Sequence, residues 1–299
     1  MDKKGVFFTA MAIFLISLFF ISYSIYDVVS DRDAIEARIE SLNNFVFSIE
    51  ADMSRQLYIT GFRTIFILEN EIIETGQAVD VNNSLQELFF NGSLNDEDMQ
   101  LMQGARLEDM ADRLQDWGEK INVNVTLDDV EIYFYQEDAW HINTKMHAHL
   151  LVEDLADLVL WNKTIETEAK IPITNFEDPL YLLETNGAIA NKIKKTPYTF
   201  SDDSNLSNHV SGGYYLASSE GISFINRLEG KQESSQYGIE SFVDLSEFSA
   251  QGLSTKDKSC IDHIYFSSDN PNSCPVSGMP SWFRIDEETD GRYGLSVSC

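Results

Sequence analysis

The stretch Val6–Tyr26 constrains this chain more than any other, because it holds twenty-one consecutive residues without a charged side chain. As a helix that rises 1.5 Å per residue it spans ~30 Å, which is about the hydrocarbon thickness of a bilayer. Five residues precede it, and 273 residues of ordinary polar sequence follow it. Whatever the remainder folds into, we expect it to be attached to one apolar helix.

Two familiar kinds of N-terminal segment can be compared with this run. A cleavable secretory signal has an apolar core of about 7–15 residues followed by a small-residue cleavage site, whereas this run is longer and ends in Ser-Tyr-Ser-Ile-Tyr. A retained signal anchor fits better. Lys3 and Lys4 precede the run, and Asp27 and Asp31 follow it. The positive-inside rule therefore predicts a cytoplasmic N-terminus and a bulk that lies outside the cell membrane.

A third interpretation comes from the residues directly before the apolar run. The sequence Lys-Lys-Gly at residues 3–5, followed by Val6, resembles the class III signal peptide of archaeal type IV pilins and archaellins. The resemblance implies that a prepilin-type peptidase cuts between Gly5 and Val6, and that the retained helix packs with its copies in a filament. Two positions depart from the family pattern. Phe7 is bulkier than the usual aliphatic residue, and Ala10 stands where bacterial pilins carry a glutamate.

Helical spacing continues beyond the apolar run. Without glycine or proline from Val6 to Thr60, the chain is predicted to form one near-continuous helix, ~80 Å long. Gly61 is expected to bend or end it, with helical spacing then resuming as far as a C-cap at Gly76. The apolar stripe either packs on the protein's own globular part, the commoner use, or forms a coiled coil between copies. It consists of Ile35, Ile39, Leu42, Val46, Ile49, Met53 and Leu57.

The apolar period then changes. Residues 80–105 are polar and turn-rich, and residues 105–121 have the pattern of an amphipathic helix. Four segments rich in Val, Ile, Tyr and Thr follow, which is typical of strands. Short polar turns between the first three predict an antiparallel meander, and a short helix near residues 153–160 is expected before the fourth. The segments are Asn122–Leu127, Val130–Gln136, Trp140–Val152 and Lys163–Ile173.

The last hundred residues are turn-rich. Residues 199–213, rich in Ser, Asp, Asn and Gly, predict a loop or a domain boundary. Beyond them we expect a second small lobe, or extra strands beside the first sheet. The predicted strands are Tyr214–Ala217, Ser223–Arg227, Cys260–Ser267, Trp282–Asp286 and Tyr293–Ser298, of which the last two form a hairpin.

Together these patterns predict an α+β fold. A long N-terminal transmembrane and extended helix is followed by helices, an antiparallel β-meander and a β-rich C-terminal lobe. The predicted divisions are a cytoplasmic leader (1–5), a transmembrane helix (6–26), an extracellular helical stalk (27–75), an α+β head domain (76–198) and the C-terminal lobe with the cysteines (199–299).

The charge of the chain limits its partners. Forty-nine acidic residues against twenty-one basic ones give a net charge of −28, which repels nucleic acid and anionic lipid head groups. We therefore expect no nucleic-acid partner. The expected partners are the membrane and further copies of the chain, in a homo-oligomer or filament held through the N-terminal helix.

Two sets of residues are candidates for covalent modification outside the cell. In an exported protein, Asn-x-Ser/Thr sequons are candidate glycosylation sites, and here they lie at Asn82, Asn91, Asn124, Asn162 and Asn205. Outside the cytoplasm, clustered cysteines favour a disulfide. Three cysteines allow one bridge and one free thiol, chosen among Cys260, Cys274 and Cys299.

Catalytic chemistry has no recognisable signature here. The sequence contains no G-x-S-x-G, no H-E-x-x-H and no glycine-rich phosphate loop, and we expect no cofactor and no enzyme activity. The weak metal candidates are His141, His147 and His149, which share the parity of one predicted strand and so face one side. Alternation of a half-buried strand already explains that pattern, so we predict no metal site.

These observations favour a membrane-anchored, surface-exposed structural protein, resembling a pilin-like filament or assembly subunit. The alternative is a monomeric signal-anchored ectodomain that acts as receptor, adhesin or envelope component without catalysis.

Overall fold

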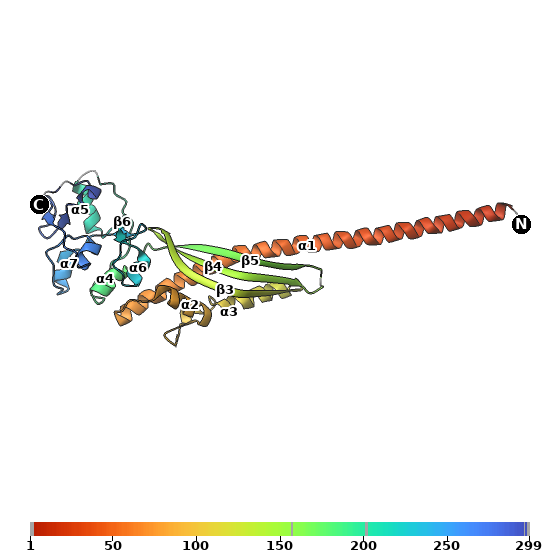
Figure 1. Cartoon of the computed structure of the whole chain (residues 1–299), viewed down its shortest axis with the longest axis horizontal. Coiled ribbons are helices and arrows are strands. Elements are labelled where there is room, and N and C mark those ends of the chain that lie inside the picture. The colour runs from red at the N-terminus through yellow and green to blue at the C-terminus, as the bar shows by residue number, and fades with distance from the viewer. Residues whose placement is uncertain (1–2, 157, 201–202, 296, 298–299) are drawn as a thin grey trace.

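The computed structural model describes residues 3–156, 158–200, 203–295 and 297. Its dominant element is α1, Lys3–Thr75, an unbroken helix of 73 residues and ~110 Å in length. Figure 1 shows the N-terminal half of α1 projecting away from the molecule, while its C-terminal half lies along a sheet. The helix ends where predicted, because Gly76 has a φ of +66° and its N–H donates to the carbonyl of Ile72 at 2.8 Å.

Gly61 does not bend or end the helix, contrary to expectation. A Cβ atom at this position would lie 2.2 Å from Thr144 Oγ1 and 2.4 Å from Ile171 Cδ1. The glycine therefore marks a close approach of α1 to the sheet, where a side chain has no room.

The apolar stripe of α1 divides into two parts. Its members from Leu42 to Leu57 are at most 3% exposed and belong to the main core. The expectation that the stripe packs on the protein's own globular part is confirmed for these residues. Ile35 and Ile39, at the N-terminal end of the same stripe, are 40% and 43% exposed.

The sheet against which α1 packs is an antiparallel meander, as predicted. Its strands are β3 (Val123–Asp138), β4 (His141–Asp154) and β5 (Leu160–Pro172), in the order β3-β4-β5. The two separate strands predicted before residue 136 are one strand with a register shift between Asp128 and Glu131, where Asp129 has a positive φ. The helix predicted near residues 153–160 is wrong, because the described part of that range is strand end and turn.

Helices cover one face of this sheet. The helix α3 (Leu107–Glu119) confirms the amphipathic pattern, and it packs on β3 with α2 (Val81–Asn91). The turn-rich interpretation of residues 80–105 missed α2, which begins after an Asp80 side chain that accepts from the Asn83 N–H. Even-numbered residues of β4 are buried beneath the helices. Short elements follow α2: β1 (Ser93–Leu94), β2 (Glu97–Asp98) and the 3₁₀ helix η1 (Gln100–Met102).

The C-terminal lobe contains more helix than predicted. Its strands form two small antiparallel sheets, β6-β7 and β8-β9. The helices are α4 (Pro179–Glu184), α5 (Asp203–Ser211), α6 (Phe224–Leu228), α7 (Leu245–Ala250), α8 (Asp262–Phe266) and the 3₁₀ helix η2 (Asp290–Tyr293). The strands are β6 (Leu216–Ile222), β7 (Ile239–Glu240), β8 (Ser273–Pro275) and β9 (Arg284–Asp286).

Three strand predictions in this lobe are wrong. Residues 223–227 and 260–267 contain α6 and α8 in place of strands, because short apolar runs do not distinguish a buried strand from one turn of helix. At α6 the local signal was present, since the hydroxyl of Ser223 caps the helix by accepting from the Asn226 N–H. The predicted C-terminal hairpin is also wrong. Its first strand, β9, pairs with β8, and residue 293 belongs to η2.

Two hydrophobic core clusters cross the predicted domain boundaries. The second half of the predicted stalk, from Leu42 onward, is part of the main core. Lobe residues such as Tyr215 and Phe224 also join that core, whereas Leu180 and Ile189, placed in the head, belong to the core of the lobe.

Candidate functional site

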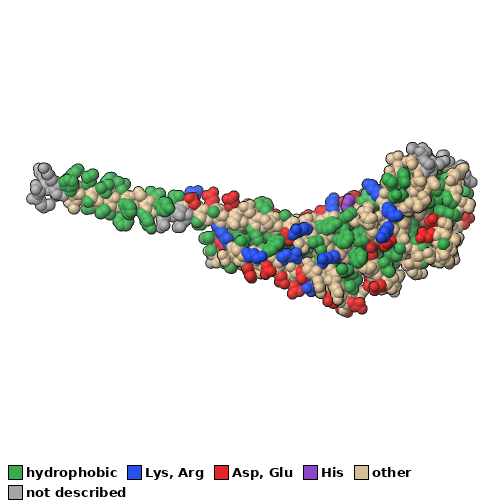
Figure 2. Space-filling view, turned by 180° about the vertical axis from the view of Figure 1, so that it is seen from behind, with side chains coloured by type: hydrophobic (Ala, Val, Ile, Leu, Met, Phe, Trp, Pro, Cys, Tyr) green, Lys and Arg blue, Asp and Glu red, His purple; other side chains and the backbone are tan. Residues whose placement is uncertain are grey.

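The N-terminal part of α1 contains the segment Phe7–Tyr26, here called the apolar rod. It is long and apolar enough to cross a membrane, and none of it is buried against the rest of the chain. Figure 2 shows it as a narrow projection covered mostly by hydrophobic side chains. The peptide bond between Gly5 and Val6, at which the resemblance implies cleavage, lies in the first turn of α1.

Between the rod and the sheet, α1 remains helical for about four turns. Near the end of this connection, Arg38 donates to the Asp154 carboxylate at 2.7 Å and to the carbonyl of Ile121 at 2.6 Å. Asp154 is the last residue of β4 and is 3% exposed. The hydrogen bond from Arg38 lowers the pKa of Asp154 against the opposing effect of burial. The direction in which α1 leaves the sheet is thus fixed by a charged pair.

The candidate metal-binding histidines lie on the outer face of β4, as their shared parity implied, and all three are half-buried: His141, His147 and His149. Each has its own neighbour: His141 Nδ1 lies 2.9 Å from Asp138 Oδ1, His147 Nε2 3.4 Å from the Tyr133 hydroxyl, and His149 Nε2 2.6 Å from Asn162 Oδ1. In the described part of the chain, no group of three or more His, Cys, Asp or Glu side chains is placed to hold a metal ion.

The sequons differ in accessibility. Asn91 and Asn162 are exposed, whereas the other three are half-buried. Each of the half-buried amides bonds within the fold: Asn82 Oδ1 accepts from the Phe134 N–H, Asn124 Nδ2 donates to Glu153, and Asn205 Nδ2 donates to the Thr199 carbonyl. Glycosylation stays a prediction, and Asn91 and Asn162 are its most accessible positions.

Among the cysteines, Cys260 is buried and carries a free thiol. Burial raises the pKa of that thiol to about 11, so it is a poor nucleophile at neutral pH. Cys299 lies outside the described residues. With Cys260 excluded, the predicted disulfide is left with the pair Cys274 and Cys299, and it stays a prediction.

A buried charged cluster joins the head to the lobe. The guanidinium of Arg227 is fully buried and lies 2.6 Å from Asp178 and 3.0 Å from Asp262. The Tyr215 hydroxyl donates to Asp178, and the Ser241 hydroxyl donates to Asp262, both at 2.8 Å. Burial raises the pKa of Asp178 despite the neighbouring cation. No sequence pattern marks this cluster, because the paired charges are 35 and 49 residues apart.

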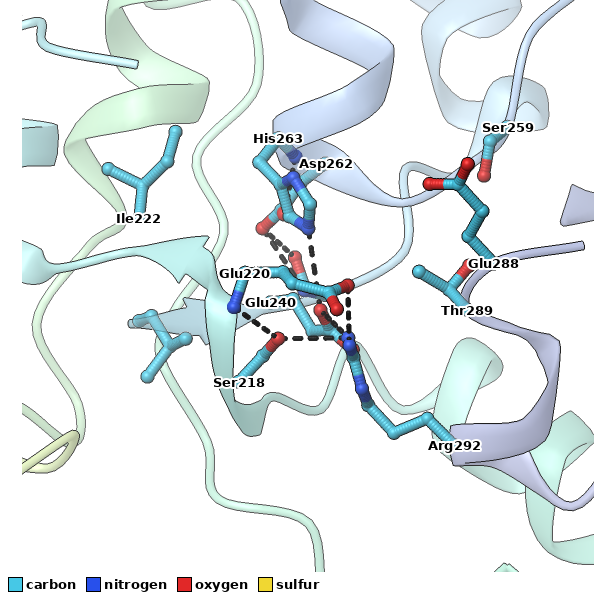
Figure 3. A network of polar contacts seen from close by, with 12 residues as sticks. Ser218, Glu220, Ile222, Glu240, Ser259, Asp262, His263, Glu288, Thr289 and Arg292 are labelled. Carbon is cyan, nitrogen blue, oxygen red and sulfur yellow. Dashed lines mark hydrogen bonds and ion pairs between the residues drawn. The ribbon is translucent and has the colours of Figure 1, made fainter. Parts of the chain in front are cut away.

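A second polar network lies at the surface of the lobe. Figure 3 shows Ser218, Glu220 and Glu240 converging on the guanidinium of Arg292, with the ring of His263 directed at Glu240. Arg292 Nη1 donates to Glu240 at 2.6 Å and to Ser218 at 2.8 Å, and its Nη2 donates to Glu220 at 2.6 Å. Burial opposes ionisation of Glu240, but the hydrogen bond from His263 and the charge of Arg292 lower its pKa to about 2.

This network borders a cavity of about 550 Å³ whose lining includes Glu220, His263 and Glu288. Glu240, held ionised with a pKa of about 2, is too weak a base to activate a nucleophile at neutral pH. The hydroxyls of Ser259 and Thr289 both donate to the Asp286 carboxylate, at 2.8 and 2.7 Å. These contacts tie the loops of the lobe together.

Comparison of the chain with known proteins found no matching protein-family model, no matching characterised protein and no matching solved structure. The arrangement of an apolar rod on a helix-covered antiparallel sheet therefore has to be interpreted from its own geometry.

Proposed function

We propose that this chain is a membrane-anchored, surface-exposed structural protein that assembles with its own copies through the N-terminal half of α1, in the manner of a pilin-like subunit. Support comes first from the difference in burial between the two halves of α1. From Leu42 onward α1 carries the core of the head, whereas none of Phe7–Tyr26 is buried against the rest of the chain. A rod of this composition has to be covered by lipid, by other copies, or by each in turn.

The single observation that carries assembly is the exposure of Ile35 and Ile39. Both lie on the face of α1 that is buried from Leu42 onward, yet they are 40% and 43% exposed. They lie ~15–20 Å beyond the end of the rod at 1.5 Å per residue, where lipid tails do not cover them. In a purely membrane-anchored monomer these two apolar side chains stay exposed to water, whereas a helix bundle formed by copies buries them.

The proposed topology follows from the flanking charges. Lys3 and Lys4 keep the N-terminus in the cytoplasm, and the acidic head faces the medium, where the exposed sequons Asn91 and Asn162 are accessible to glycosylation. Cleavage between Gly5 and Val6 by a prepilin-type peptidase would release the rod from its leader, so that it can leave the lipid for the core of a filament.

The test is sedimentation and electron microscopy of the chain expressed in a host that carries a prepilin peptidase and its assembly ATPase. We expect sedimentable polymers whose N-terminal residue is Val6. The Ile39→Gln variant should assemble poorly while it remains in the membrane, whereas the Ala37→Gln variant, on the opposite side of the helix, should assemble normally. A chain that keeps Met1 and stays monomeric in the membrane would instead support the signal-anchored ectodomain.

A further inference from the structure

The turn between β4 and β5 exposes three leucines at the end of the sheet that lies nearer the rod (Figure 1). Leu155, Leu158 and Leu160, here called the leucine turn, are 66%, 49% and 59% exposed. They also line a cavity of about 480 Å³. Contiguous apolar patches on a folded protein mark sites of interaction with proteins or membranes. The leucine turn is therefore a candidate interaction surface.

Hydrogen bonds hold the base of the leucine turn in place. The Asp154 N–H donates to the Val159 carbonyl at 3.0 Å, and Val159 packs against the main core. The Leu155 N–H donates to the Asn122 carbonyl at 3.1 Å. Arg38 of α1 donates to that same carbonyl at 3.3 Å and to the Asp154 carboxylate at 2.7 Å. The leucine turn is thus attached to α1 at the level of Arg38.

The two exposed isoleucines of α1 lie at the same level. Ile35 and Ile39 are within one turn of Arg38, on the side of α1 that faces the core from Leu42 onward. The charge of Arg38, which lies between these isoleucines and the turn, is neutralised by Asp154. The leucine turn therefore extends the apolar surface of Ile35 and Ile39 from the helix onto the head.

The position of this level along α1 decides what can cover it. Because α1 is unbroken, Arg38 lies ~18 Å beyond Tyr26 at 1.5 Å per residue. The head groups of a bilayer extend only ~5–8 Å beyond its hydrocarbon on each side. With the rod across the membrane, the leucine turn therefore lies in water unless a protein surface covers it.

The size of the surface also favours a protein partner. A stable interface between proteins buries roughly 800 Å² on each partner. Two half-exposed isoleucines fall well short of that area. The leucine turn raises the number of large apolar side chains exposed at this level from two to five, and the rod continues the apolar surface toward the N-terminus.

We propose that the leucine turn of one copy packs against Ile35 and Ile39 of a second copy, a contact that rests on the proposed assembly through α1. Rods that cross one membrane in the same direction are parallel, so the same level of each copy can meet without displacement along the helix. The contact makes the head a part of the interface. Its apolar side chains then leave water together with those of α1.

The test is disulfide cross-linking between two differently tagged chains, expressed together in the host that carries the prepilin peptidase and its assembly ATPase. One chain carries Leu155→Cys and the other Ile35→Cys. After mild oxidation, we expect at least fivefold more dimer bearing both tags than in two controls. The first control pairs Leu155→Cys with Ala37→Cys, on another side of α1, and the second pairs Ile35→Cys with Asp116→Cys, at an exposed position of α3.

The outcomes separate this contact from assembly itself. Polymers in which Ile39→Cys cross-links to its own copies, while Leu155→Cys and Ile35→Cys stay at the level of the controls, would overturn the role of the leucine turn and leave the proposed function standing. Absence of polymers and of every cross-link would overturn both.

A polar substitution measures what the leucine turn contributes. Leu155→Gln should lower the yield of sedimentable polymer at least threefold without a change in the midpoint of thermal unfolding. Leu101→Gln replaces a leucine that is 48% exposed elsewhere on the head, and should change neither quantity. An equal yield from both variants would contradict the proposal.

Lipid is the other possible cover, and a spin-labelled phosphatidylcholine distinguishes it. Bimane attached at Leu155→Cys should be quenched little by a nitroxide in the head group, whereas bimane at Tyr26→Cys, at the end of the rod, should be quenched strongly. Equal quenching at the two positions would assign the leucine turn to the membrane surface and overturn the proposal.

Discussion

The guanidinium of Arg38 lies 2.7 Å from the carboxylate of Asp154, a residue 116 positions away at the end of β4. Asp154 is almost fully buried. Arg38 also binds the carbonyls of Ile121 and Asn122. The pair therefore holds three chain segments together where α1 leaves the sheet.

Replacing Arg38 by methionine should loosen this junction. The change leaves the Asp154 carboxylate buried without its cation, at a cost of about 2 kcal/mol in the free energy of unfolding. Because the folded-state pKa of Asp154 is lowered, the ion pair stabilises the folded protein above pH ~4, and this stabilisation disappears in acid. Arg38→Met should therefore lower the free energy of unfolding at pH 7 and have little effect at pH 3. Urea unfolding at pH 7 and at pH 3 measures it. Arg32→Met, at an exposed position on α1, is the control, and an equal effect of both variants would refute the role of the pair.

Gly61→Ala tests the close packing of α1 on the sheet. In an exposed helix interior this change stabilises by about 1 kcal/mol. Here the new methyl group would overlap Thr144 and Ile171, so we expect destabilisation of about 1–3 kcal/mol from overpacking. The midpoint of thermal unfolding checks the sign. Gly291→Ala, where a Cβ meets nothing within 4 Å, should be close to neutral. A stabilised Gly61→Ala variant would contradict the packing described.

Arg227→Met tests the cluster that joins head and lobe. Two carboxylates, Asp178 and Asp262, would remain fully buried without a cation, at a cost of about 3–5 kcal/mol. Arg55→Met removes an exposed pair with Asp52 on α1 and should have little effect. Chemical unfolding followed by the fluorescence of the four tryptophans reports the loss. Equal stability of the two variants would be incompatible with a structural role for the cluster.

His209 should make the lobe sensitive to acid. It is fully buried, its Nδ1 lies 3.0 Å from the Thr196 hydroxyl, and its Nε2 has no hydrogen-bond partner among the described residues. Burial lowers its pKa to about 4, although the charge of Glu240 acts in the opposite direction. Between pH ~6.5 and 4 the unfolded chain binds a proton that the folded chain does not, so stability falls as pH falls, by about 1.4 kcal/mol per pH unit.

The measurement for His209 is urea unfolding at pH 7.5 and pH 5. His209→Phe should remove most of the difference between the two pH values, because Phe fits the surrounding aromatic cluster and does not titrate. His149→Gln, on the outer face of β4, should leave the difference in place. A pH dependence unchanged in His209→Phe would assign the acid sensitivity to other groups.

Long periodic segments were predictable from the sequence. The helix as far as Thr60, the antiparallel meander and α3 follow from apolar spacing over ten or more residues, and the glycine at residue 76 marks the C-cap. The lobe was not predictable in detail, because its helices of five or six residues are too short to establish a period. Gly61 carried an ambiguous signal, since a glycine within a helical pattern marks either a bend or a close contact.

The polar sites were hidden for a different reason. Arg227 and Glu240 are ordinary charged residues in a chain with seventy of them, and only the fold reveals which are buried. The exposure of Ile35 and Ile39 was likewise invisible, because the sequence shows the stripe but not where the sheet ends beneath it.

Disulfide cross-linking at residue 39 tests most directly whether copies of α1 pack together beyond the membrane. Ile39→Cys and Ala37→Cys place a thiol on the same helix, on sides that differ by about 160° at 3.6 residues per turn, and the unmodified chain controls for the native cysteines. After mild oxidation of intact membranes or polymers, we predict cross-linked dimers for Ile39→Cys and few for Ala37→Cys. Equal cross-linking of both variants, or none above the unmodified chain, would contradict assembly through this face of α1.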